Sequence, residues 1–75
     1  MKRNEIVARR LRDLRKQKSI AEDRDITQKE VAEANDIHPS TMSAYETNGN
    51  VPLEVAWRLA DYYGVSLDEL CGRAA

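Results

Sequence analysis

The sequence has little of what metal sites, disulfide-bonded folds and most enzymes require. Its only cysteine, Cys71, excludes an internal disulfide, and a free thiol of this kind is typical of the reducing cytoplasm. Its only histidine, His38, excludes a metal site built on two histidines. The three glycines stand apart and form no phosphate-binding loop. We therefore expect no metal, no cofactor, no small-molecule ligand and no catalytic activity, and we predict a binding domain.

Long hydrophobic runs are also missing. No apolar stretch approaches the roughly 20 residues that cross a bilayer, and none resembles a secretory signal. Hydrophobic residues still make up 41% of the 75 residues, which is enough for one small globular core. We therefore predict a single cytoplasmic domain over residues 1–75, with no membrane contact.

Charge is unevenly distributed, although the net charge is only −1. Residues 1–18 hold eight basic and two acidic side chains, a balance of +6, whereas residues 19–75 have a balance of −7. A basic segment favours contact with a polyanion such as nucleic acid. However, a pI of about 5.8 is not typical of a nucleic-acid-binding domain. A basic, solvated helix explains the same pattern, so charge alone leaves both interpretations open.

Hydrophobic spacing predicts a first helix over about residues 4–18. Its inner face is marked by three apolar residues at helical spacing, Val7, Leu11 and Leu14. Its outer face is basic and includes Arg12. The polar and acidic residues 19–25 that follow are predicted to form a loop.

Capping residues predict four further helices. Thr27 and Glu30 form a capping box, in which each side chain accepts a backbone N–H of the other residue. Pro39 suits the first turn of the next helix, and Gly49 can take the left-handed conformation that ends it. The last two helices are predicted over about residues 53–63 and 66–70. The predicted fold is therefore all-α, with five helices and no strand.

The same spacing predicts which side chains of these helices face the core. In the second and third helices they are Val31, Ala34, Asn35, Met42 and Tyr45. In the fourth helix they are Ala56, Leu59, Ala60 and Tyr63, and Trp57 is expected to join the same packing.

Several motifs, in the same order and spacing, resemble the phage-repressor and Cro-like (Xre) family of helix-turn-helix regulators. The residues that carry the resemblance are Thr27–Ala32, Ile37, Ser40–Ser43, Tyr45, Glu46 and Gly64–Leu70. The resemblance implies a compact lambda-repressor-like domain with its helix-turn-helix at about residues 27–48. It also implies a sequence-specific, repressor-like transcriptional regulator of double-stranded DNA. Its recognition helix, about residues 39–47, would enter the major groove.

The resemblance further implies roles for individual residues. Those that face the bases are Pro39, Ser40, Ser43 and Ala44. Those that contact phosphates are Gln28, Thr41, Thr47 and the loop of Asn48, Gly49 and Asn50, which would present backbone amides to the DNA. Arg15 and Glu46 match a charged pair that joins the first helix to the recognition helix. Arg12 is predicted to contact phosphate because of its place on the basic face.

The sequence departs from the family pattern in three places. About six extra residues, 20–25, form an acidic insert after the first helix. Asp36 stands where the family has a turn glycine, a position that aspartate tolerates. The base-facing set lacks Arg, Lys, Asn and Gln, which are the usual readers of base edges. We therefore expect weak direct readout, with specificity supplied by DNA shape and a second half-site.

A homodimer would supply that second half-site. Because the family often dimerises at its C-terminal end, we predict that Leu67, Leu70 and Cys71 lie at the interface. The alternative is that these side chains complete the core of the monomer. A different function is also open: a protein-interaction module on the same fold, such as an antitoxin-like partner or a component of a larger complex. The acidic insert and the small recognition side chains favour that alternative.

Overall fold

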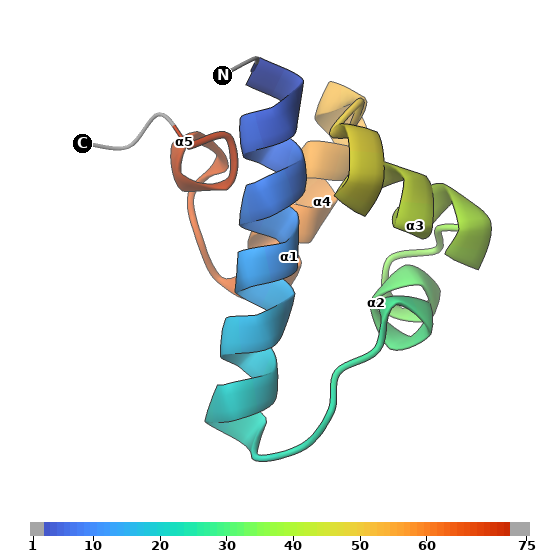
Figure 1. Ribbon diagram of the computed structural model, residues 1–75, viewed down its shortest axis with the longest axis vertical. Coiled ribbons are helices and arrows are strands. Elements are labelled where there is room, and N and C mark those ends of the chain that lie inside the picture. The colour runs from blue at the N-terminus through green and yellow to red at the C-terminus, as the bar shows by residue number, and fades with distance from the viewer. Residues whose placement is uncertain (1–2, 73–75) are drawn as a thin grey trace.

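A long first helix runs the length of the domain, with the last short helix on one side of it and the other short helices on the opposite side (Figure 1). The computed structural model describes residues 3–72. Its helices are α1 (Arg3–Glu22), α2 (Gln28–Ala34), α3 (Pro39–Asn48), α4 (Leu53–Tyr63) and α5 (Leu67–Leu70). No strand occurs among the described residues, so the predicted all-α architecture is confirmed.

The first helix is longer than predicted. Residues 19–22, expected in a loop, continue α1 to Glu22, and only residues 23–27 connect it to α2. Lys18 pairs with Glu22 one turn further on, at 2.6 Å between Nζ and Oε2, which supports the additional turn. Asp23 then takes a left-handed φ of 53°, and the Arg24 N–H donates back to the Ser19 carbonyl. The acidic insert is therefore partly a helix extension.

The core lies between α1 and the helices packed on it. Its fully buried large side chains include Leu11, Ile26, Met42, Leu59 and Leu70. Val7 and Leu14 join them from α1, as predicted. Each described helix thus contributes at least one buried side chain to a single hydrophobic cluster.

Two predicted inward positions are wrong. Trp57 is 60% exposed, because it follows Ala56 by about 100° around the helix and so lies outside the inner stripe of α4. Ala34 is exposed while Ala32 is buried, since these residues are about 200° apart on α2. Asn35, in contrast, is buried as predicted, and its Nδ2 donates to the Val31 carbonyl at 2.9 Å.

The helix ends follow the predicted capping residues. The Thr27 hydroxyl accepts the Glu30 N–H at 3.1 Å. The Glu30 carboxylate does not complete a capping box, because both of its oxygens accept hydrogen bonds from Arg24 instead. Gly49 and Gly64 end α3 and α4 with φ values of 72° and 69°. Asp36 has a φ of 57° in the turn between α2 and α3, so it takes the place of a turn glycine.

Candidate nucleic-acid interface

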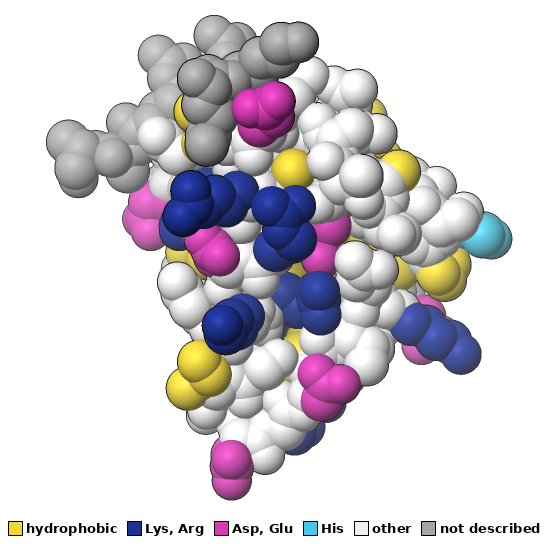
Figure 2. Space-filling model, in the orientation of Figure 1, with side chains coloured by type: hydrophobic (Ala, Val, Ile, Leu, Met, Phe, Trp, Pro, Cys, Tyr) yellow, Lys and Arg dark blue, Asp and Glu magenta, His cyan; other side chains and the backbone are white. Residues whose placement is uncertain are grey.

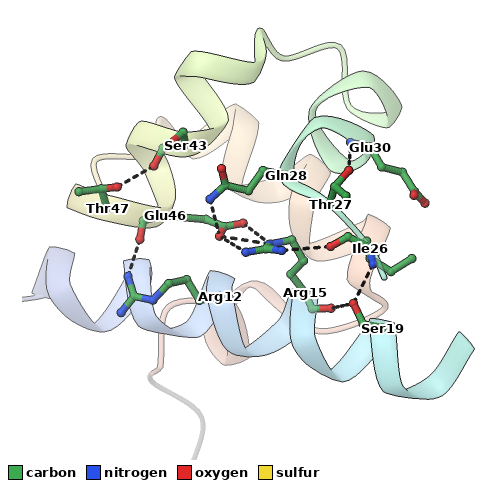
Figure 3. Close-up of polar contacts among 10 residues, drawn as sticks. All are labelled: Arg12, Arg15, Ser19, Ile26, Thr27, Gln28, Glu30, Ser43, Glu46 and Thr47. Carbon is green, nitrogen blue, oxygen red and sulfur yellow. Dashed lines mark hydrogen bonds and ion pairs between the residues drawn. The ribbon is translucent and has the colours of Figure 1, made fainter. Parts of the chain in front are cut away.

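The third helix is held against the first by a buried ion pair. Arg15 of α1 donates from Nε to Glu46 Oε2 and from Nη2 to Glu46 Oε1, each at 3.0 Å (Figure 3). The Glu46 side chain is 1% exposed and the Arg15 side chain 25%. The hydrogen bonds from Arg15 to Glu46 raise the pKa of the guanidinium, so Arg15 stays positively charged. Such a forked contact fixes orientation as well as distance.

Two further side chains meet the same residue of α3. Gln28, in the first turn of α2, donates from Nε2 to Glu46 Oε1 at 3.0 Å. Arg12 of α1 donates from Nη1 to the Glu46 backbone carbonyl, near the negative end of the α3 dipole. Figure 3 shows the three donors converging on Glu46 from two helices. The structure therefore brings together Gln28, Arg12 and the Arg15–Glu46 pair around a single carboxylate residue.

The four residues predicted to face bases lie within the first six residues of α3. Pro39 and Ser40 are exposed, and Ser43 and Ala44 are partly exposed. This face is small and uncharged. It can offer hydroxyl groups and a methyl group to a partner, but no guanidinium or amide.

His38 is a residue of this surface for which the sequence predicts only a helix start. Its ring Nδ1 accepts the Ser40 N–H at 3.2 Å and lies 2.8 Å from the Ser40 hydroxyl, so it caps α3 and orients Ser40. A histidine before Pro39 marks the helix boundary but carries no signal for this second contact.

The loop after α3 differs from its expected role. The Gly49 N–H donates to the Tyr45 carbonyl at 3.0 Å, and the Asn50 N–H donates to Asn48 Oδ1 at 2.8 Å. Both amides are satisfied within the chain and are not presented outward. What the loop does expose is the side chains of Asn48 and Asn50.

Gly49 has a structural reason for being glycine. It is buried, and a Cβ on it would lie 1.8 Å from the Asn4 carbonyl oxygen. The Asn4 side chain also donates from Nδ2 to Asn50 Oδ1. The loop is thus seated directly on the first turn of α1, which fixes where its exposed side chains stand.

The two threonines predicted to contact phosphates, Thr41 and Thr47, differ in their surroundings. The Thr47 hydroxyl donates to the Ser43 carbonyl at 2.9 Å, so it must rotate before it can donate to a phosphate. Thr41 is partly exposed in the first turn of α3.

Basic side chains form a row over α1 in the face shown in Figure 2. Arg9, Arg12 and Lys16 of α1 are exposed, as the charge pattern predicted. Lys2 and the Arg3 side chain, also counted in the basic segment, lie outside the part of the chain that the structure describes. The acidic insert is partly neutralised, because Arg24 pairs with Glu22 at 3.1 Å and with Glu30 at 2.6 Å.

The predicted dimer residues at the C-terminal end are mostly used by the monomer. Leu70 is fully buried in the core, and Leu67 packs against the same core cluster. Cys71 is partly buried and lines a groove with Asn4 and Val51. The prediction that Leu70 forms a dimer surface is therefore wrong, because one small core already covers it.

The chain is similar to a known protein family. The model of a family described as helix-turn-helix matches residues 11–70, which is well over half of the chain. No curated protein and no solved structure matches the chain.

Among the described residues, no helix is both long and apolar enough to span a bilayer. In the same residues, no group of three or more His, Cys, Asp and Glu side chains is placed to hold a metal ion.

Proposed function

We propose that this chain, which belongs to the phage-repressor and Cro-like (Xre) helix-turn-helix family of DNA-binding regulators, binds operator DNA with α3 in the major groove. The observation that carries the proposal is the bracing of α3 by three side chains on Glu46. A recognition helix must keep its outer face at a constant angle, and this bracing leaves that face free. The protein would act in the cytoplasm as a repressor-like regulator.

Phosphate contacts would position α3 on the duplex. Gln28 has two amide hydrogens on Nε2, of which one is donated to Glu46, and the second is available for a phosphate oxygen. Arg12 likewise retains donors beyond the one given to the Glu46 carbonyl. Thr41 would add a contact in the first turn of α3, and Asn48 and Asn50 would add contacts at its C-terminal end. Gly49 contributes by seating the loop rather than by donating its amide.

Base recognition would rest on Pro39, Ser40, Ser43 and Ala44. Serine hydroxyls bond to several bases, and the alanine methyl can contact a thymine methyl, so each position discriminates weakly. Sequence preference would therefore come largely from DNA shape and from two half-sites read by a homodimer.

Random-site selection with the purified protein tests this function. We expect enrichment of a two-fold symmetric site and a steep fall of affinity with added salt, because phosphate contacts release counterions. A Ser40→Ala, Ser43→Ala double variant should retain binding but enrich a less defined site. Failure to retain any duplex at low salt would contradict the proposal and favour the protein-interaction alternative.

A further inference from the structure

Two of the most exposed large apolar side chains lie together at the start of α4. Leu53 is 65% exposed and Trp57 60% exposed, and they stand one turn apart on the same side of the helix. Neither is needed to hold α4 on the core, because Ala56, Leu59 and Ala60 form its buried side. An apolar pair of this size on a small domain is typical of an interaction surface.

Charged side chains flank this apolar pair. Leu53 and Trp57 line a shallow groove together with Glu54, Arg58 and Asp61. None of these three charged residues forms an ion pair within residues 3–72. Arg58 donates from Nη1 to the Asn35 carbonyl at 2.9 Å and keeps other donors free. The groove therefore presents an acid and a base one turn apart, beside an uncovered tryptophan.

We propose that two copies of the chain associate through this groove, with their α4 helices packed antiparallel across a two-fold axis. In such an interface the same patch meets itself, so each contact occurs twice. If the two α4 helices run antiparallel and the two-fold axis passes near the first turn of each, Trp57 of one copy lies against Leu53 of the other. It also places Arg58 of one copy beside Glu54 of the other. Apolar and charged positions are thus self-complementary, which indicates a second copy rather than an unlike partner.

The position of the groove suits a DNA-binding dimer, and this role rests on the proposed function. α4 starts four residues after Gly49, whose loop is fixed on the first turn of α1. A two-fold axis at the start of α4 would therefore hold the two α3 helices at a defined separation. Half-site spacing follows from such a constraint. The proposed dimer surface is therefore the exposed side of α4, in place of the surface on α5 that the sequence predicted and in which Leu70 is buried.

Sedimentation velocity without DNA tests the interface, from about 1 μM to about 1 mM protein. We expect a monomer–dimer equilibrium, accompanied by a blue shift in the emission of Trp57, the only tryptophan in the sequence. Trp57→Ser should raise the dimer dissociation constant at least about 30-fold. Ile20→Ser, which alters an apolar side chain that is 71% exposed on α1, should leave it unchanged. A wild-type chain that stays monomeric, or a Trp57→Ser chain that associates as tightly, would overturn the proposal.

Charge exchange tests the pairing itself. Glu54→Arg and Arg58→Glu should each abolish self-association, because each places like charges opposite one another. Mixed together, the two variants should form a dimer, since one then carries only positive and the other only negative charge at these positions. Circular dichroism must show both variants folded, because Arg58 also contacts Asn35. Folded variants that do not associate when mixed would overturn the antiparallel arrangement.

DNA binding is measured separately by mobility shift, so the two proposals can fail independently. A monomer that binds its site without self-association would overturn the α4 interface alone. A dimer that binds no DNA would contradict the proposed function and leave the interface supported.

Discussion

Arg15 and Glu46 are 31 residues apart in the chain, yet their side chains form a forked ion pair that joins α1 to α3. The Arg15 Nη1 group also donates to the Ile26 carbonyl at 3.0 Å, so the same guanidinium anchors the residue before Thr27, the N-cap of α2. One side chain thus connects the three segments that define the angle of the helix-turn-helix.

Removing Arg15 should destabilise the fold strongly. In Arg15→Ala the Glu46 carboxylate remains buried without its cation, which costs about 3 kcal/mol. Arg15→Lys should lose less, because it keeps the charge but not the fork. Urea unfolding measures both, with exposed Arg9→Ala as the control expected to lie within about 0.5 kcal/mol of wild type. A stable Arg15→Ala chain would show that the pair does not support the fold.

Two glycines with the same backbone conformation provide a matched comparison. Gly64→Ala should cost only the left-handed strain, about 1–2 kcal/mol, because no atom beyond the adjacent residues lies within 4 Å of the new Cβ. Gly49→Ala adds a collision with the Asn4 backbone and should cost about 1–3 kcal/mol more. Thermal or urea unfolding of the two variants decides the order. Equal losses would mean that the contact with Asn4 is not tight in solution.

Gln28→Ala should affect DNA affinity and stability together. Without the proposed phosphate hydrogen bond the affinity should fall by about 1–3 kcal/mol, and without the observed bond to Glu46 the stability should fall by about 1 kcal/mol. Fluorescence anisotropy with operator DNA measures the first effect, and urea unfolding the second. Gln17→Ala, at an exposed position of α1, is the matched control. Reduced stability with unchanged affinity would restrict Gln28 to positioning α3.

Reversing one charge of α1 should weaken DNA binding at every sequence. Arg12→Glu should reduce the salt dependence by about one counterion for each phosphate that the side chain no longer neutralises. Arg10→Glu makes the same change on the same helix, but Arg10 Nε donates to the Glu69 carbonyl of α5. We expect the salt slope of that control to match wild type. If the salt dependence of DNA affinity were the same for wild type and Arg12→Glu, Arg12 would not contact a phosphate.

The titration of Glu30 should depend on Arg24. Hydrogen bonds from the Arg24 guanidinium, at 2.8 and 2.6 Å, lower the pKa of Glu30 below its usual 4.5. A depressed carboxyl pKa stabilises the fold above the unfolded pKa, and this contribution is lost as the pH falls through the folded pKa, below 4.5. In Arg24→Gln the pKa should rise towards 4.5, as followed by NMR of the side-chain carboxyl. Lys29→Gln, which changes the residue next to Glu30 in the sequence, should leave the pKa of Glu30 unchanged.

Local signals in the sequence were sufficient for most helix boundaries. Thr27, Pro39 and Ser66 begin helices because their side chains or fixed φ satisfy the first turn, and that effect needs no distant contact. Gly64 ends α4 for an equally local reason. The resemblance to the helix-turn-helix family rested on these same motifs, and the family match confirms it. The charged pair of Arg15 and Glu46 came from that resemblance and is present.

Contacts between distant segments decided the rest. Spacing shows that α4 has apolar residues on more than one side, but only packing determines that Leu59 is buried and Trp57 is exposed. The sequence cannot distinguish a leucine in the core from one at an interface, because the side chain is the same in both. Leu70 is buried because α5 packs against α1. Gln28 meets Glu46 only because the turn at Asp36 folds α2 against α3. The sequence by itself determined the elements and most of their ends, since these follow from adjacent residues. The tertiary structure decided which faces and donors remain available to a partner, since that depends on what the rest of the chain already covers.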